Sequence, residues 1–243
     1  MNNVREILKN RLVQVQKKIE EACRPIGRSA DSVHLLVVTK SVDSPIVREL
    51  FELGLRDFGE NRPQELSRKA KALSDLPIRW HMIGNLQRNK IDMVLDVGPE
   101  IIHSVDRIKL VHALEDSLAK RQKCQKIFLE VNASGESNKH GFSPNELLQF
   151  SSELMNYPHL QICGLMTMAA YSEDPTECLP TFRLLAQLRD KLQQQRDSLN
   201  PQNRPTHTIS ELSMGMSNDY EIAIMAGATW IRLGTVLLEG LSV

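Results

Sequence analysis

A lysine at position 40 ends an apolar run, residues 35–39, that has the pattern of a buried strand. The stem of a lysine in that position lies in a low dielectric, which disfavours the charged amine and lowers its pKa. A lysine with a lowered pKa is a nucleophile that forms a Schiff base with an aldehyde. The alternative is that Lys40 extends into solvent from the strand end, the commoner fate of a single lysine. The choice between the two depends on what faces this residue.

Two segments near the other end of the chain have the residue types of a phosphate site. Residues 213–217 read Ser-Met-Gly-Met-Ser and precede a predicted helix, where backbone N–H groups and the hydroxyls of Ser213 and Ser217 can bind an anion. Gly234 and Thr235 add a backbone that permits close approach and one more hydroxyl. The alternative is that Ser217 is an ordinary helix cap. A Schiff-base lysine that faces a phosphate site is the pairing that pyridoxal 5′-phosphate (PLP) requires.

Arg232 lies among apolar residues in a strand pattern, and an unpaired buried charge is very unfavourable. We consider three positions for it: a structural salt bridge at the barrel bottom, an outward orientation, and a position beside the pyridine nitrogen or phosphate of a cofactor. Met214 is either core filler or a contact for an aromatic ligand ring. His81 and His103 fall within predicted strands and are interpreted as structural histidines rather than acid–base groups.

Short β-rich runs alternate eight times with helical patterns, which predicts an α/β fold in the form of a (β/α)8 barrel. An open doubly wound sheet would carry a glycine-rich turn after its first strand, and residues 39–42 contain no glycine. We therefore expect one barrel domain over residues 1–243, with an amphipathic N-terminal helix within residues 1–25 packed on it. The predicted strands cover residues 33–39, 56–59, 79–83, 101–105, 126–131, 161–166, 206–210 and 229–233. The helical patterns between them cover residues 45–53, 62–72, 85–94, 107–121, 144–155, 175–195 and 219–226.

The barrel interpretation brings the candidate residues to one face of the molecule. In such barrels functional groups gather at the carboxyl ends of the strands, and phosphate commonly lies at the loops after strands seven and eight. Lys40 follows the first predicted strand and Asn61 the second. Residues 213–217 follow the seventh, and Gly234 begins the turn after the eighth.

Bulk properties exclude several kinds of site. The 30 Lys and Arg residues balance the 30 Asp and Glu residues, which argues against nucleic acid or a membrane surface as a partner. The four cysteines form no C-x-x-C pair and no histidine has metal-ligand spacing, so no metal site is expected. The N-terminus shows no apolar signal region, and no apolar stretch has membrane-spanning length. We expect a cytoplasmic monomer.

Taken together, these motifs resemble the pyridoxal phosphate homeostasis protein family over about residues 33–239. The resemblance implies a barrel like the N-terminal domain of alanine racemase, with PLP held as an aldimine on Lys40. It also implies that Arg232 approaches the pyridine nitrogen. The motifs, in the same order as in the family, are residues 37–40, 58–61, 80–90, 103–106, 130–132, 164–166, 212–217 and 232–235. The other implied cofactor-binding residues are Ser213, Ser217, Gly234 and Thr235 at the phosphate, and Asn61 and Met214 at the ring.

Two classes of function fit a PLP-binding barrel: a racemase-type enzyme and a non-catalytic carrier. An arginine at the pyridine nitrogen keeps that nitrogen unprotonated and weakens the electron sink that catalysis uses. Racemisation also needs an acid–base group opposite the lysine, which alanine racemase takes from a second domain. The sequence ends at Val243, soon after the eighth strand, so we expect no such domain and no catalytic residue. A carrier is favoured, with apo PLP-dependent enzymes as recipients. A Schiff-base aldolase for phosphosugars is a third reading, although its lysine usually lies on a later strand.

Overall fold

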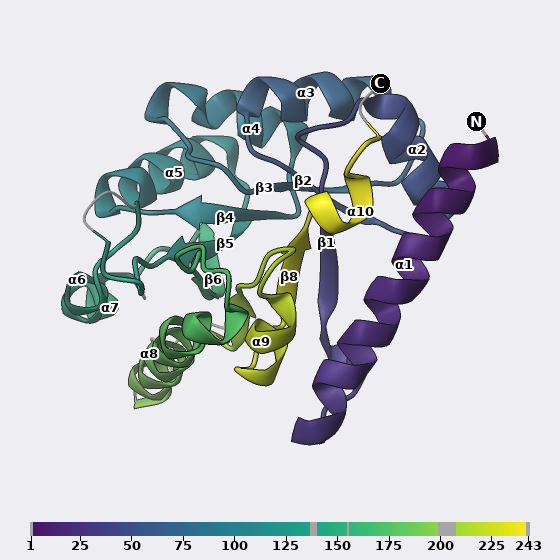
Figure 1. Cartoon of the computed structure of the whole chain (residues 1–243). Coiled ribbons are helices and arrows are strands. Elements are labelled where there is room, and N and C mark those ends of the chain that lie inside the picture. The colour runs from purple at the N-terminus through teal and green to yellow at the C-terminus, as the bar shows by residue number, and fades with distance from the viewer. Residues whose placement is uncertain (1, 137–139, 155, 199–207, 242–243) are drawn as a thin grey trace.

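Eight parallel strands close into a barrel in the computed structural model, which describes residues 2–136, 140–154, 156–198 and 208–241. Each strand pairs with the next along the chain, and the eighth pairs with the first (Figure 1). The predicted α/β barrel is confirmed. The strands are β1 His34–Val38, β2 Asp57–Glu60, β3 Arg79–Met82, β4 Ile101–Val105, β5 Gln125–Glu130, β6 Leu160–Met166, β7 Glu211–Ser213 and β8 Trp230–Leu233.

Helices surround the barrel (Figure 1). The predicted helix over residues 85–94 begins only at residue 88, as a 3-10 turn, η3, that leads into an α-helix. The predicted helix over residues 144–155 is divided at Phe150, and residue 155 lies outside the described part of the chain. The helices are α1 Asn2–Cys23, η1 Arg24–Ile26, η2 Ala30–Ser32, α2 Ser44–Glu52, α3 Pro63–Ala72, η3 Arg88–Lys90, α4 Ile91–Val97, α5 Ile108–Arg121, α6 Pro144–Gln149, α7 Ser151–Leu154, η4 Pro175–Cys178, α8 Leu179–Ser198, α9 Tyr220–Met225 and α10 Thr235–Leu238. Within the described ranges, none of these helices is both long and apolar enough to cross a bilayer.

The seventh strand is displaced from its predicted position. Residues 208–210 of the prediction are not strand, residues 206 and 207 lie outside the described part of the chain, and β7 is Glu211–Ser213. The physical reason is the register with β6, where Gly164 pairs with Glu211. A Cβ atom on Gly164 would lie 1.8 Å from the Glu211 carbonyl oxygen, so this close approach requires glycine. As a result Ser213 is the last residue of the strand rather than the first residue of the loop.

The barrel has a small apolar interior that is separate from its main core. The main core joins the strands to the surrounding helices, with Phe58 and Met82 from strands and Leu50 and Leu66 from helices among its members. The interior cluster consists of residues from five strands around the barrel, namely Leu36, Ile101, Phe128, Cys163, Met166 and Trp230. The strands also contribute buried polar side chains, among them His81, His103, Ser213 and Arg232.

The N-terminal helix α1 packs against α9 and α10 (Figure 1). Arg11 Nη1 donates to the carbonyl oxygens of Leu237 and Glu239 at the end of α10, at 2.9 and 2.8 Å. Lys18 Nζ pairs with Glu221 Oε1 in the first turn of α9 at 2.8 Å. Helix α1 therefore braces the two helices that follow the candidate phosphate segments.

Candidate cofactor site at the carboxyl end of the barrel

Closure of the barrel places Lys40 near the Gly234 turn. Leu233 pairs with Val37, so Gly234 lies beside Val38, two residues before Lys40. A Cβ atom on Gly234 would lie 3.3 Å from the Val38 carbonyl oxygen, which shows how closely the two backbones approach. The first and eighth strands are distant in the sequence and adjacent in space, so the predicted lysine and the predicted phosphate turn lie at neighbouring strand ends.

The burial predicted for the stem of Lys40 is wrong. Strand β1 ends at Val38, the fully buried residue at its end is Thr39, and Lys40 itself is exposed. The chain turns outward directly after Thr39, because the Thr39 side chain and carbonyl group are held inside the protein. The amine of Lys40 is accordingly accessible from the carboxyl end of the barrel.

A buried ion pair holds the backbone beneath Lys40. Lys69 Nζ on α3 donates to Glu60 Oε1 at 2.6 Å and to the Thr39 carbonyl oxygen at 2.7 Å. The Thr39 hydroxyl donates to the same Glu60 oxygen at 2.5 Å. The side chains of Lys69 and Glu60 are 1% and 0% exposed, so water does not screen this pair. The sequence analysis did not identify Lys69. The signal for it was Glu60, because a carboxylate that directly follows a buried strand needs a positively charged partner.

Arg232 points into the mouth of the barrel. Its Nη1 donates to Ser213 Oγ at 2.7 Å, and its Nη2 donates to the Thr167 carbonyl oxygen at 2.9 Å. Both partners stand at the carboxyl ends of strands, which excludes the salt bridge at the barrel bottom and the outward orientation. Burial lowers the pKa of Arg232 to about 10, and the negative charges of Glu130 and Asp219 oppose that shift.

A line of hydrogen bonds continues from Ser213 through the barrel interior. His103 Nδ1 lies 2.8 Å from Ser213 Oγ, and His103 Nε2 lies 3.1 Å from His81 Nδ1. His81 Nε2 in turn lies 3.1 Å from Asp57 Oδ1, and Arg79 donates to both oxygens of Asp57 at 2.7 and 2.5 Å. Both histidines are buried with each ring nitrogen partnered, as the structural interpretation predicts.

Burial determines the ionisation of this line. It lowers the pKa of His81, although the hydrogen bond that His81 donates to Asp57 opposes the shift. It lowers the pKa of His103 to well below the ordinary value, and the charge of Arg232 and the proximity of His81 act in the same direction. Burial also opposes ionisation of Asp57, but hydrogen bonds from Arg79 and His81 outweigh it and bring the pKa of Asp57 to about 2. The carboxylate is charged and both imidazoles are neutral near pH 7.

The two candidate phosphate segments meet at the mouth. The hydroxyl of Ser217 accepts from the backbone N–H of Val236 at 3.2 Å, which ties the loop after β7 to the start of α10. Gly215 in this loop has φ of 93°, and a Cβ there would lie 2.6 Å from the Ala223 side chain, so the loop packs closely on α9. The structure therefore brings Ser217 together with the Gly234 turn.

For three of the predicted cofactor-binding residues, Ser213, Met214 and Asn61, the structure does not test the predicted contact. The Ser213 hydroxyl is fully buried beside His103 and Arg232. Met214 is also fully buried and belongs to the main core, in line with its alternative reading as core filler. Asn61 is half-buried and lines a hollow of about 230 Å3, together with Asn85, Gln87 and Lys90 among others. The cofactor contacts of these three residues stay predictions.

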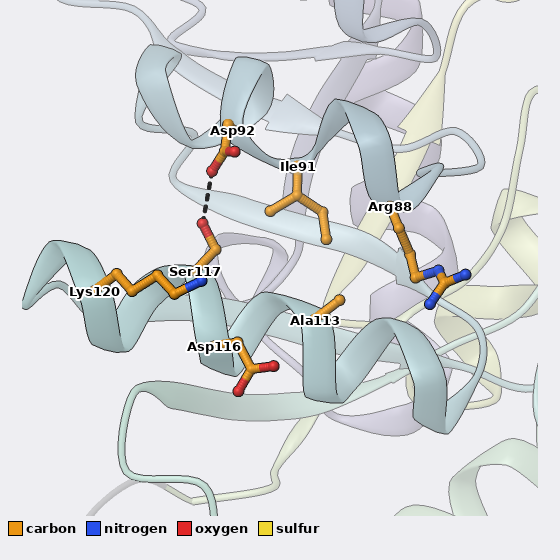
Figure 2. Close-up of a pocket in the computed structure, with 7 residues that line it drawn as sticks. All are labelled: Arg88, Ile91, Asp92, Ala113, Asp116, Ser117 and Lys120. Atoms are coloured by element: carbon orange, nitrogen blue, oxygen red, sulfur yellow. Dashed lines mark hydrogen bonds between the residues drawn. The ribbon is translucent and has the colours of Figure 1, made fainter.

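A second hollow, of about 280 Å3, is unrelated to the predicted site residues. Figure 2 shows it between the segment that contains Arg88 and Asp92 and helix α5, with Ser117 Oγ donating to Asp92 Oδ1 at 2.7 Å. Its lining is mostly polar and mixed in charge, and it lies on the outer helical layer. Throughout the described ranges, this hollow included, no cluster of three or more His, Cys, Asp or Glu side chains could hold a metal ion.

Glu130, at the end of β5, is a titratable group that sequence reasoning did not single out. Its side chain is 5% exposed. Burial and the nearby charge of Asp106 raise the pKa of Glu130 to about 7, and Arg232 opposes the shift. No local pattern could signal this, because the shift arises from burial in the folded barrel and from the charge of Asp106 after β4.

We expect Glu130→Gln to reduce the pH dependence of stability. The native pKa lies above that of the unfolded chain, so native Glu130 binds a proton more tightly and wild-type stability falls as pH rises from about 4.5 to 7. The fall in the free energy of unfolding between pH 5 and pH 8 should shrink by up to about 3 kcal/mol in the variant. Urea unfolding at both pH values measures it, with exposed Glu173→Gln as the control. An unchanged pH dependence in Glu130→Gln would contradict the assignment.

Comparison with known proteins identifies the family. The sequence model described as alanine racemase, N-terminal domain, matches residues 16–241. The pyridoxal phosphate homeostasis protein of Aquifex aeolicus (strain VF5) is 38% identical over 227 residues, which cover 93% of this chain and 95% of that protein. The protein of the same name from Pseudomonas aeruginosa is 37% identical, with 93% and 92% covered. The chain belongs to the pyridoxal phosphate homeostasis protein family.

A solved structure of a related protein has the same fold. PipY of Synechococcus elongatus PCC7942, solved with PLP bound, is 32% identical and has a TM-score of 0.79. The match covers 95% of this chain and 99% of PipY. The resemblance deduced from the motifs, including the barrel of the alanine racemase type, is confirmed.

Proposed function

We propose that this protein binds PLP without catalysis and serves vitamin B6 and amino-acid homeostasis in the cell, with PLP held through Lys40. The observation that carries the proposal is the position of Lys40 and the Gly234 turn at the ends of adjacent strands, with Arg232 inside the same mouth. The PLP-bound relative PipY supports it. PLP supplies an aldehyde for the lysine amine and a phosphate for the turn.

The residues at the mouth fit the chemistry of this cofactor. Ser217, Gly234 and Thr235 would hold the phosphate, with the missing Cβ of Gly234 leaving room at the backbone. Arg232 would face the pyridine nitrogen. Its two hydrogen bonds go to neutral oxygens, Ser213 Oγ and the Thr167 carbonyl, and a further neutral acceptor such as an unprotonated ring nitrogen suits a buried guanidinium.

The same arginine supports a non-catalytic role. A ring nitrogen that stays unprotonated is a poor electron sink, whereas catalysis commonly pairs this nitrogen with a carboxylate. The relatives that this chain matches over nine-tenths of its length are named as homeostasis proteins. We further propose a cytoplasmic monomer that passes PLP to apo PLP-dependent enzymes.

A racemase-type PLP enzyme is the second candidate, and one observation favours it. Glu130 lies at the same end of the barrel and exchanges its proton near pH 7, as an acid–base group must. Incubation of the PLP-loaded protein with L-alanine in heavy water separates the two functions. A carrier should incorporate no deuterium at the α-carbon beyond the rate of free PLP, whereas an enzyme should incorporate it at a rate that Glu130→Gln lowers.

Titration with PLP tests the proposal directly. The protein should develop visible absorption, and borohydride reduction followed by peptide mapping should locate the phosphopyridoxyl group on Lys40. Pyridoxal, which lacks the phosphate, should bind at least about tenfold more weakly, since charge-assisted hydrogen bonds to an anion contribute about 1.5 kcal/mol or more. A protein that takes up no PLP would contradict the proposal.

A further inference from the structure

A continuous chain of buried polar side chains crosses the barrel from Asp57 to Arg232. Its members are Asp57, His81, His103, Ser213 and Arg232, which come from β2, β3, β4, β7 and β8 and are between 0% and 7% exposed. Each is hydrogen-bonded to the next at 2.7–3.1 Å. This chain gives each buried polar group a hydrogen-bond partner. It also has a fixed direction, because the groups at its two ends determine which atom donates in every hydrogen bond within it.

The direction can be derived from the Asp57 end. Asp57 receives both hydrogen bonds of Arg79 and is a carboxylate, which only accepts. His81 Nε2 must therefore carry a proton and donate to it. His81 is neutral, so its Nδ1 is an acceptor, and His103 Nε2 is the donor toward it.

The Arg232 end is consistent with this direction. A guanidinium only donates, so Ser213 Oγ accepts from Arg232, and the single proton of the Ser213 hydroxyl must go elsewhere. Neutral His103 has its proton on Nε2, which leaves Nδ1 to accept that hydroxyl proton. All donors in the chain thus point from Arg232 toward Asp57. The Ser213 hydroxyl has no second proton for a phosphate.

We propose that Asp57, His81 and His103 are positioning residues of the cofactor site, which act through Ser213 to hold the Arg232 guanidinium in one orientation at the mouth of the barrel. The ring that Arg232 faces is PLP, so this part rests on the proposed function. Ser213 then serves Arg232 rather than the phosphate. Loss of His103 leaves the Ser213 proton without its acceptor, so the hydroxyl that accepts from Arg232 Nη1 is no longer held in one orientation. The phosphate turn is untouched.

Nitrogen-15 NMR of the histidine side chains, on protein without added PLP, tests the chain itself. Both imidazoles should be neutral Nε2–H tautomers from about pH 7 to 8.5, because burial lowers the pKa of each ring below its ordinary value. The charged groups that act on them are Asp57, Arg79, Glu100 and Arg232. An Nδ1–H tautomer, or protonation of either ring within this range, overturns the proposal whether or not the protein binds PLP.

Binding by matched variants tests the consequence for the cofactor. His103→Leu should raise the PLP dissociation constant about tenfold, the value of one buried hydrogen-bond partner. His103→Asn retains an acceptor oxygen for Ser213 and should restore most of the affinity, and His112→Leu on the surface of α5 should have no effect. The preference for PLP over pyridoxal should be the same in all of them.

Two further results separate the possible failures. If His103→Leu does not fold, Ser213→Ala removes the side-chain acceptor of Arg232 with a smaller change and should show the same loss of affinity. Equal loss in His103→Leu and His103→Asn, or no loss in either, overturns the positioning role. A wild-type protein that binds no PLP refutes the proposed function instead, and the tautomer measurement then decides about the chain alone.

Discussion

Lys40→Ala is expected to abolish the covalent attachment of PLP. The visible absorption of the bound cofactor should disappear, and borohydride should leave no phosphopyridoxyl group on the protein. The physical reason is that the phosphate turn and Arg232 supply only non-covalent contacts, whereas the aldehyde needs an amine at the neighbouring strand end. Lys40→Arg should behave in the same way, because a guanidinium keeps the charge but does not lose its proton.

Lys90→Ala provides the matched control for this prediction. Lys90 lines the hollow that contains Asn61, between the loops after β2 and β3, and it supplies a second amine at this end of the barrel. Its replacement should leave the spectrum and the mapped attachment site unchanged. Attachment to Lys90, or a full spectrum in Lys40→Ala, would show that the cofactor amine has been assigned to the wrong residue.

Lys69→Met is expected to destabilise the protein by about 3–5 kcal/mol, the typical effect of breaking a buried ion pair. The substitution leaves the Glu60 carboxylate uncompensated at 0% exposure and removes the donor to the Thr39 carbonyl. One oxygen of Glu60, Oε2, already lacks a hydrogen-bond partner in the structure, so little is available to replace the lysine. Urea unfolding at pH 7 measures the change, and the melting temperature should fall by roughly 10 °C or more.

Two variants define what this result means. Lys71→Met changes an exposed lysine of the same helix and should alter the free energy of unfolding by less than about 0.5 kcal/mol. The double variant Lys69→Met/Glu60→Leu removes both charges and should recover much of the loss, since an apolar pair replaces a buried ion pair at little net change. If Lys69→Met is as stable as the wild type, the ion pair between Lys69 and Glu60 contributes nothing to the free energy of unfolding.

The sequence determined the barrel and the general place of the site. Strand and helix periodicities are local properties, and eight repetitions of one unit leave few closed arrangements. Lys40 after the first strand and Gly234 after the eighth thus indicated a shared mouth before any contact was known. The error at the seventh strand has a non-local cause: residues 206–210 have the stronger strand composition, but the contact at Gly164 selects Glu211–Ser213.

Tertiary structure alone decided which polar groups meet. His103 and Ser213 are 110 residues apart in the chain, and Lys69 reaches Glu60 from a helix on the outer layer. The ionisation of Glu130 and Arg232 follows from burial and from charges on other strands, which no window of sequence contains. Lys40 is exposed because Thr39 is anchored from below. Residue types and their order specify the chemistry that is possible, and packing specifies which partners it has.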